Sequence, residues 1–436
     1  MKNIFFIGAL LCSFISYSQS LGYNDLGKLF TDEDNNGTAR FRGMSGAFGS
    51  LGGDMSAIEI NPAGTAVFMK SEFATTMNFR DENITSNYYG NSTLTNNDYS
   101  NISQVGGVFV FDTGKSTWSK TAIGFNYSVS KNYESHWIAQ GNSNYPTFIY
   151  DDDYTDDGDN SNDTIYLNSN GQSFENFSDG ENGKYTFTFA SQYSDKLYVG
   201  AAFTTNDVRL YQSVFLEEDN NDGMGNNLTG SLHEELLTFG TGYSFNLGII
   251  SKPSNNIRIG LSYQSPTWYD LTEEFDSEDG FNDFQYSMTT PSKITGSFAY
   301  IFSQSGLVSL DYAYRNYSGI DLSPSQEFSE ENQIFSTDFR GTSELRLGTE
   351  WRVKQFSFRG GYHYQQSPYL NAPATNDLTG FSAGVGFNFG TVKLDIAYEA
   401  SKKHDSYDFY PQYDEVDTTD LKIDNSKITA TIVFKI

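Results

Sequence analysis

The acidic, oxygen-rich segments hold the residues with the plainest potential for metal binding. Asp32, Asp34 and Asn36, followed by Gly37, have the spacing of a calcium-binding loop. Gly43 stands where such a loop needs a bidentate glutamate. A solvated acidic loop is therefore the simpler interpretation, and loose calcium binding is the alternative. No motif predicts a resident metal or a cofactor.

Catalytic and haem-binding arrangements are scarce. Among the 4 histidines, only His404 has an adjacent aspartate, Asp405. Neighbouring side chains on a strand point to opposite faces, so this pair is not suited to hydrolysis. His363 falls on the polar face of its predicted strand, where it could ligate haem, although a hydrogen bond within the wall is the simpler role. We therefore expect no enzymatic activity.

Composition excludes two classes of protein. The 436-residue chain contains 36 Phe, 30 Tyr and 40 Gly but only 9 Pro, and its formal net charge is −28. A disordered chain would lack so many aromatic residues. A strongly acidic surface disfavours binding to a phosphate backbone. Intrinsic disorder and nucleic-acid partners are therefore excluded.

The first residues have the pattern of a secretory signal. Lys2 supplies a positive charge, residues 4–15 form a short apolar run, and Ser16 and Ser18 frame a small-residue cleavage site. We predict a signal peptide over residues 1–18. The single cysteine, Cys12, lies within it, so we expect neither disulfides nor thiolate chemistry in the mature chain. No later run reaches about 18 apolar residues, so we expect no transmembrane helix.

The elements that position all other residues follow a period of two, which dominates from about residue 72 to the end. In residues 121–130, Ile123, Phe125 and Tyr127 share one face, and small or polar residues share the other. This alternation indicates strands with one apolar and one polar face. Fourteen strands are predicted, centred near residues 76, 107, 125, 188, 200, 239, 260, 297, 310, 347, 360, 384, 396 and 430.

The connections between these strands alternate in length. Short turns are expected at one end of the sheet and long polar loops at the other. The long loops are predicted at residues 81–103, 132–182, 207–230, 268–287, 316–341, 367–377 and 402–424. An even strand count with this asymmetry is the plan of an outer-membrane β-barrel. We therefore predict an all-β fold, a transmembrane antiparallel barrel of about 14 strands that spans residues 71–436.

The alternative is a soluble β-sandwich, since alternation alone does not say whether the apolar face points inward. Three features favour the barrel. The loop lengths are asymmetric, and the apolar faces are rich in Tyr and Phe near the strand ends, as an interfacial girdle requires. The polar faces also carry charge, at Arg258, Arg315, Arg346, Glu350, Arg359 and Asp395.

Residues 19–70 do not alternate, and their glycine-rich runs suit a compact element without strands. A fourteen-stranded barrel is too wide for its own side chains to fill, so this segment is predicted to be a plug, or hatch, in the lumen. A periplasmic tail is the alternative. The charged residues Arg40, Arg42, Asp54 and Glu59 are expected to pair with the charged lumen face.

This segment resembles the hatch of the FadL/TodX/OmpP1 family of outer-membrane transporters. The resemblance runs from Ala39 through Gly43, Gly46 and Asp54 to Asn61-Pro62-Ala63-Gly64. Weaker matches follow in order at residues 291–293, 311–314, 345–348, 359–362 and 367–369. Within the motif, Pro62 fixes its own φ and restricts Asn61. We expect a rigid hatch corner there, with Asn61 bonded to lumen groups.

The resemblance implies a barrel of the bacterial outer membrane that takes up hydrophobic molecules, such as long-chain fatty acids or aromatic hydrocarbons. It implies binding, hatch rearrangement and lateral exit at a kinked third strand. Residues 121–131 show no proline or bulge signal for such a kink. The expected surroundings are lipid, lipopolysaccharide and the barrel assembly machinery, and the expected state is a monomer.

Aromatic residues interleaved with acids in the long loops are candidates for ligand capture, although they could equally pack the loops together. These are Trp137, Phe148, Trp268, Tyr269, Phe275, Phe281 and Phe284. Two other functions stay open. One is a porin-like channel for polar solutes. The other is a surface receptor or adhesin, including a haem receptor, that the barrel only anchors.

Overall fold

The structure is a computed structural model that describes residues 21–114, 117–151, 164–277, 280–413 and 415–436. The predicted signal peptide lies outside the described residues. Within them, no helix has both the length and the apolar character needed to cross a membrane.

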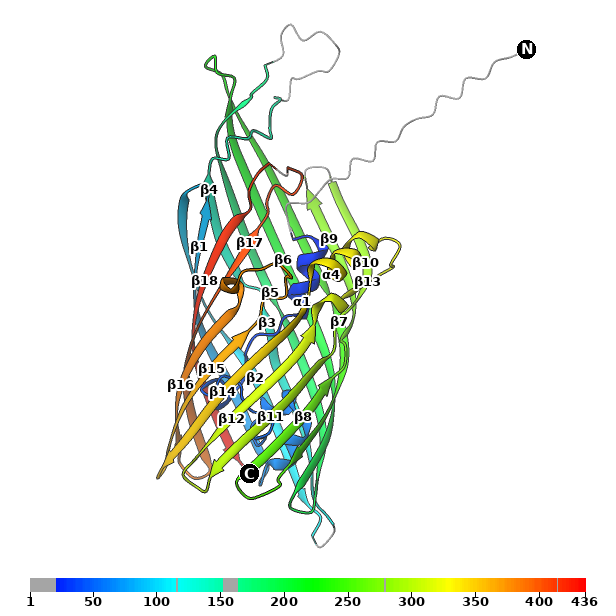
Figure 1. Ribbon diagram of the computed structural model, residues 1–436, viewed down its shortest axis with the longest axis vertical. Helices are drawn as coiled ribbons and strands as arrows, with labels where there is room; N and C mark the ends of the chain where they lie inside the picture. The colour runs from blue at the N-terminus through cyan, green and yellow to red at the C-terminus, as the bar shows by residue number, and fades with distance from the viewer. Residues whose placement is uncertain (1–20, 115–116, 152–163, 278–279, 414) are drawn as a thin grey trace, which may run out of the picture.

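The described chain forms one closed antiparallel sheet (Figure 1). Its strand segments are β1 (Glu72–Tyr88), β2 (Asn91–Asp112), β3 (Trp118–Asn132), β4 (Ser135–Gly141), β5 (Asn168–Tyr193), β6 (Leu197–Asn221), β7 (Asn227–Ser251), β8 (Ile257–Gln264), β9 (Trp268–Ser277), β10 (Gly280–Thr289), β11 (Lys293–Phe302), β12 (Gly306–Asn316), β13 (Asp321–Ser323), β14 (Gly341–Val353), β15 (Phe356–Gln365), β16 (Leu378–Asn388), β17 (Val392–Tyr407) and β18 (Thr419–Lys435).

Four pairs of consecutive segments each make one interrupted barrel strand: β3 with β4, β8 with β9, β10 with β11, and β12 with β13. The 18 segments therefore make 14 barrel strands. The barrel closes where β1 pairs with β18, from Glu72 opposite Lys435 to Asn87 opposite Asp420. All fourteen predicted strand centres lie within these strands, and the predicted fold class is confirmed.

The apolar face of the barrel points outward. Phe187, Phe189 and Phe298 expose 53%, 57% and 45% of their surface, whereas the inward-facing Thr186 and Thr188 are buried. In lipid an outward apolar face is solvated, and a sheet that closes on itself pairs the backbone groups of its first and last strands. The outward row of aromatic residues therefore belongs to a membrane wall and not to an internal core.

Several predicted loops are in fact strand. The segment 81–103 is a hairpin that turns at Tyr89 and Gly90, and 207–230 and 268–287 are also nearly continuous hairpins. The loop predictions there were wrong because the extensions mix polar and charged residues with apolar ones. In two of them the apolar residues, such as Val208, Leu210 and Leu271, point inward, so the pattern of the membrane-spanning part is lost although the ladders continue. The β5–β7 extensions rise well above the rest of the barrel (Figure 1).

The N-terminal segment lies inside the barrel (Figure 1). It contains α1 (Tyr23–Thr31), α2 (Ala39–Arg42), α3 (Ala57–Ile60) and the 3-10 helix η1 (Pro62–Val67). Phe41, Met44 and Phe48 pack against Ala299 and Leu307 of the wall. Nearer the long hairpins, α1 packs against α4 (Ser329–Asp338), which follows η2 (Tyr317–Gly319) and β13. The short helix η3 (Ala374–Asn376) precedes β16.

Wall glycines make room for the hatch. A Cβ at Gly200 of β6 would lie 2.6 Å from the backbone nitrogen of Ala63, and a Cβ at Gly248 of β7 would collide with the Asn61 side chain. Because the obstacle at Gly200 is backbone, it cannot move aside as a flexible side chain would. Glycine at this position therefore allows η1 to dock against β6.

We expect Gly200→Val to leave the barrel assembled but to prevent η1 from docking, because the new side chain would overlap the hatch backbone. Limited proteolysis should then cut residues 21–70 faster, with the heat-modifiable electrophoretic mobility of the barrel retained. Gly296→Val is the matched control, since a Cβ at that β11 position meets nothing within 4 Å. Equal cleavage of both variants would contradict this role of Gly200.

Candidate functional site

The Asn61-Pro62-Ala63-Gly64 motif forms a buried corner between α3 and η1. Asn61 has φ −140° and ψ 103°, its Oδ1 accepts a hydrogen bond from the Ala63 N–H, and Pro62 begins η1. The Asn61 Nδ2 donates to the carbonyl of Gly49 at 2.7 Å and to that of Ile249 on β7 at 3.1 Å. One side chain thus caps a helix, joins two parts of the hatch and ties the hatch to the wall.

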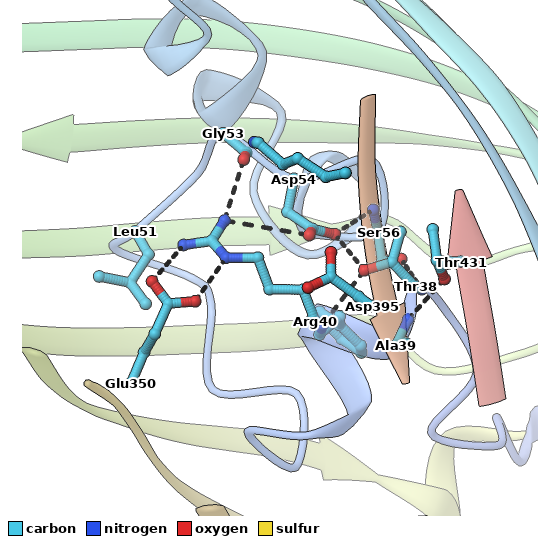
Figure 2. A network of polar contacts seen from close by, with 12 residues as sticks. Thr38, Ala39, Arg40, Leu51, Gly53, Asp54, Ser56, Glu350, Asp395 and Thr431 are labelled. Atoms are coloured by element: carbon cyan, nitrogen blue, oxygen red, sulfur yellow. Dashed lines mark hydrogen bonds and ion pairs between the residues drawn. The ribbon is translucent and has the colours of Figure 1, made fainter. Parts of the chain in front are cut away.

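A second contact between hatch and wall is ionic (Figure 2). The Arg40 Nε lies 2.9 Å from Glu350 Oε2, and its Nη1 donates to the Gly53 carbonyl at 3.1 Å. Glu350 is 1% exposed and also pairs with Arg359, which pairs in turn with Asp395 at 2.7 Å. The negative charge of the buried Glu350 carboxylate is therefore balanced by a hatch cation and a wall cation together.

Asp54 lies beside this network. Its Oδ1 accepts hydrogen bonds from the Thr38 hydroxyl and the Ser56 N–H, and its Oδ2 lies 4.0 Å from Arg40 Nη1. Asp54 thus organises the hatch internally and does not pair with the wall as expected. The other expected pairs do cross to the wall: Arg42 meets Glu399 at 3.4 Å, and Glu59 meets Lys184 at 3.7 Å.

Glu33 and Asp34 also anchor the hatch. Glu33 lies within 3.5 Å of Lys184, Lys293 and Arg315. Burial alone would raise the pKa of the Glu33 carboxyl, but these cations outweigh it and hold that pKa well below its usual range. No sequence pattern singled out Glu33, because its three partners come from wall strands far away in the chain.

Contacts of the same kind argue against the calcium alternative at Asp32, Asp34 and Asn36. Asp34 lies 3.1 Å from Lys131 and 3.7 Å from Lys427, and the pKa of its carboxyl is lowered because these ammonium groups outweigh the effect of burial. Asp32 instead accepts a hydrogen bond from the Tyr317 hydroxyl. No group of three or more metal-ligating side chains gathers anywhere in the described part of the chain.

The barrel wall has a seam beside Asp34. β2 pairs with β3 only from Asp112–Lys120 to Gln104–Ser128, and β4 pairs with β5 but not with β2. Just past the last pair, the carbonyls of Val129 and Ser130 accept hydrogen bonds from the hatch, from Asn36 Nδ2 and the Asp34 N–H, each at 2.8 Å. Over this stretch the hatch replaces β2 as a bonding partner of β3.

The seam coincides with a β-bulge. The register of β3 against β5 shifts between Val129 and Lys131, which leaves Ser130 as the extra residue. The bulge lies in the strand for which the family resemblance implied a kink, although the sequence of residues 121–131 showed no signal for it. The strand's own residues give no signal, because the partners that stabilise the irregular backbone belong to the hatch.

A lumen cavity of about 300 Å³ borders the seam and the top of the hatch. Its apolar lining includes Leu29, Tyr133, Trp137 and Tyr407, whereas cations cluster on the β3 and β17–β18 sides. The cationic lining residues are Lys28, Arg80, Lys131, Lys402, Lys403 and Lys427. The cavity is thus amphipathic, with hatch carboxylates balancing part of its positive charge.

The predicted capture residues are mostly not in loops. Trp137 lies on β4, Trp268, Tyr269 and Phe275 on β9, and Phe281 and Phe284 on β10, so only Phe148 lies outside the strands. The loop assignment was wrong because these strands continue beyond the apolar band. Of the seven, only Trp137 lines the lumen cavity. Tyr269, Phe275 and Phe284 belong to the apolar cluster around α1 and α4.

A family model described as outer membrane protein transport protein (OMPP1/FadL/TodX) matches residues 34–409. The chain belongs to this family. The resemblance to this family and the outer-membrane location are therefore confirmed, and the family is described as one of outer-membrane transport proteins. No curated protein matches the chain.

Solved structures of the FadL/TodX type share the fold at low identity. A Pseudomonas aeruginosa FadL homologue aligns with a TM-score of 0.62 at 15% identity, covering 93% of this chain and 99% of that one. The CymD monoaromatic hydrocarbon channel gives 0.56 at 13% identity, covering 92% and 98%. The P. putida toluene transporter TodX gives 0.54 at 14% identity, covering 92% and 99%.

Asn61→Ala should leave barrel assembly intact while lowering the uptake of hydrophobic compounds. The variant loses the cap of η1 and the bond to β7, at a cost of about 1 kcal/mol for the cap. Uptake is compared at equal surface levels, with Asn168→Ala on the exposed end of β5 as the control. Unchanged uptake in Asn61→Ala would contradict the assigned role.

Arg40→Ala should free the hatch, since it removes the ion pair that ties the hatch to the buried Glu350 of the wall, while Arg359 and Arg352 still balance that carboxylate. In planar bilayers we expect a higher ionic conductance than for the unaltered protein. Arg352→Ala is the matched control, because Arg352 pairs with the same Glu350 at 2.6 Å but its side chain is 53% exposed. If both variants conduct alike, the Arg40 contact does not hold the hatch.

Proposed function

We propose that the protein imports hydrophobic small molecules across the outer membrane, with long-chain fatty acids or aromatic hydrocarbons as the substrate class. In this scheme residues 1–18 direct export, residues 19–70 act as the hatch, and residues 71–436 form the barrel. The ligand binds in the lumen cavity, the hatch rearranges, and the ligand leaves sideways through the wall.

The single observation that carries this proposal is the hatch-bonded seam. The carbonyls of Val129 and Ser130 are bonded to Asn36 and Asp34 at the point where the β2–β3 ladder stops. A shift of the hatch that releases these bonds would uncover a stretch of wall in which β2 and β3 have no ladder between them. Because the cavity borders the same stretch, binding and exit would be coupled.

A lateral route suits an apolar cargo. A hydrophobic ligand that left into the periplasm would lose favourable burial on entering water, whereas a ligand that passes through the seam moves from cavity to lipid. The hatch would then serve as the moving element, and the wall below the seam would stay closed by the regular β2–β3 ladder.

The lining of the cavity favours a fatty acid over an aromatic hydrocarbon. Lys131, Lys427 and Lys403 can balance a carboxylate, whereas Trp137 and Tyr407 offer apolar contact for a chain. An uncharged aromatic ring would leave these buried cations without any new partner. We therefore propose a long-chain carboxylate as the preferred cargo.

The same charged lining would suit a channel for polar solutes, which makes it the second candidate. The hatch argues against free passage, because buried ion pairs join it to wall strands at Glu350, Glu399 and Lys184. Continuous flow would require these pairs to break, leaving charges buried without partners.

The folded protein in liposomes separates the two candidates. Import predicts entry of a labelled long-chain fatty acid above the protein-free rate and exclusion of a small sugar. Sugar entry without fatty-acid entry would replace the proposal with an open polar channel. Entry of neither would contradict transport and favour a receptor role.

A further inference from the structure

A groove lies on the outer wall of the barrel, away from the seam. It encloses about 330 Å³ across β16, β17, β18 and β1. Outward-facing Ala400 and Ser426 lie opposite each other on β17 and β18, and these small side chains leave the hollow. Phe381 and Tyr398, 66% and 49% exposed, form its apolar sides.

The groove sits where the outer wall changes from apolar to polar. One row toward the short turns, Tyr398 is paired with Ile428, which is paired with Phe79, and all three are exposed to lipid. One row toward the long hairpins, Lys402 lies opposite Asp424 in the register of β17 and β18. A molecule in the groove would therefore have its chain in the apolar band and its head group beside Lys402.

Lys402 is the cation available to a ligand there. The carboxylate of the neighbouring Asp424 already forms an ion pair with Lys422, at 2.6 Å from its Nζ. The carboxylate of Asp81 on β1 accepts a hydrogen bond from the side chain of Asn83. The Lys402 side chain is exposed, and no hydrogen bond or ion pair of its ammonium group is found within the described chain. An anionic head group would supply the missing partner.

The groove and the lumen cavity meet at one place in the wall. Both are lined by Ser401, Lys402 and Asn425. The β16–β17 ladder ends at the Thr379–Lys402 pair, and beyond it β17 continues to Tyr407 with β18 as its only strand partner. On the side of β17 that faces away from β18, the segment 366–377 forms the wall beyond the end of β16. This segment includes η3 and lines the cavity through Pro368, Tyr369 and Asn376.

We propose that this groove is a lateral intake site for a single-chain, carboxylate-headed amphiphile from the outer leaflet. The acyl chain lies against Phe381 and Tyr398, the carboxylate pairs with Lys402, and the ligand passes over the end of β16 into the lumen cavity. The inference rests on the proposed import function and adds where the cargo enters. Intake on β16–β17 and exit at β3 would then use separate parts of the wall.

A photoreactive fatty acid tests the site directly. A long-chain fatty acid with a diazirine on its chain is added to the outside of liposomes that hold the full protein, irradiated, and mapped by mass spectrometry. Adducts are expected on outward-facing residues of β16 and β17. Lys402→Glu should reduce them about fivefold, the scale of an exposed ion pair, and Lys402→Arg should retain them. Ala400→Trp, which fills the groove, should abolish them and slow fatty-acid uptake.

Two variants serve as controls. Ala201→Trp adds the same bulk to an exposed position on β6, and Lys196→Glu makes the same charge change in the exposed turn between β5 and β6. Neither should alter labelling or uptake. If Ala400→Trp and the unaltered protein are labelled equally, the groove is not an intake site, whatever the fatty-acid uptake of the variant. Groove labelling without any uptake would keep the binding site and overturn the import function instead.

Discussion

The structure depends on the pairing of charges inside a closed barrel. Arg40 of the hatch and Arg359 of the wall share Glu350, which is 1% exposed, and Glu33 is surrounded by three wall cations. A buried charge without a partner is strongly destabilising, so the hatch can dock in only one register. The pairs between Arg40 or Glu33 of the hatch and the wall join residues 151 to 310 positions apart, and together they make plug and wall a single unit.

This constraint explains how a chain with only 37% hydrophobic residues folds. Lipid solvates the outward Phe, Tyr, Leu and Ile side chains, so the interior need not be apolar. Inside, small wall residues such as Gly200 and Gly248 let the hatch backbone approach, and polar groups find partners across the lumen. The irregular β3 backbone at Ser130 is tolerated for the same reason. Hatch groups donate hydrogen bonds to the β3 carbonyls that are not paired with β2.

The barrel fold and its fourteen strands could be predicted from the sequence because alternation with a period of two is a local property of each strand. The pairing of Arg40, Arg42 and Glu59 with the wall was also predicted from the sequence, since charged residues in a plug need partners of opposite charge in the wall. Prediction failed where the determinant is non-local. The extensions beyond the membrane-spanning part mix polar and charged residues with apolar ones, and inward-facing residues such as Val208 and Leu271 are apolar. These extensions therefore look like loops, and Trp268 and Phe281 were misplaced. Glu33 and the Ser130 bulge depend on partners brought close only by closure of the barrel. The sequence left a calcium alternative open at Asp34 because the lysine partners of its carboxylate lie far away in the chain, on β3 and β18.

In the proposed mechanism the hatch closes the lumen and controls a sideways route for an amphipathic cargo. The most direct test is a cryo-electron microscopy structure of the protein in lipid nanodiscs with a long-chain fatty acid bound. The account predicts ligand density in the lumen cavity near Lys131 and Lys427, with Asp34 withdrawn from the Ser130 carbonyl. A ligand-bound structure with the hatch still bonded to β3, and density running through the hatch toward the short-turn end, would contradict it.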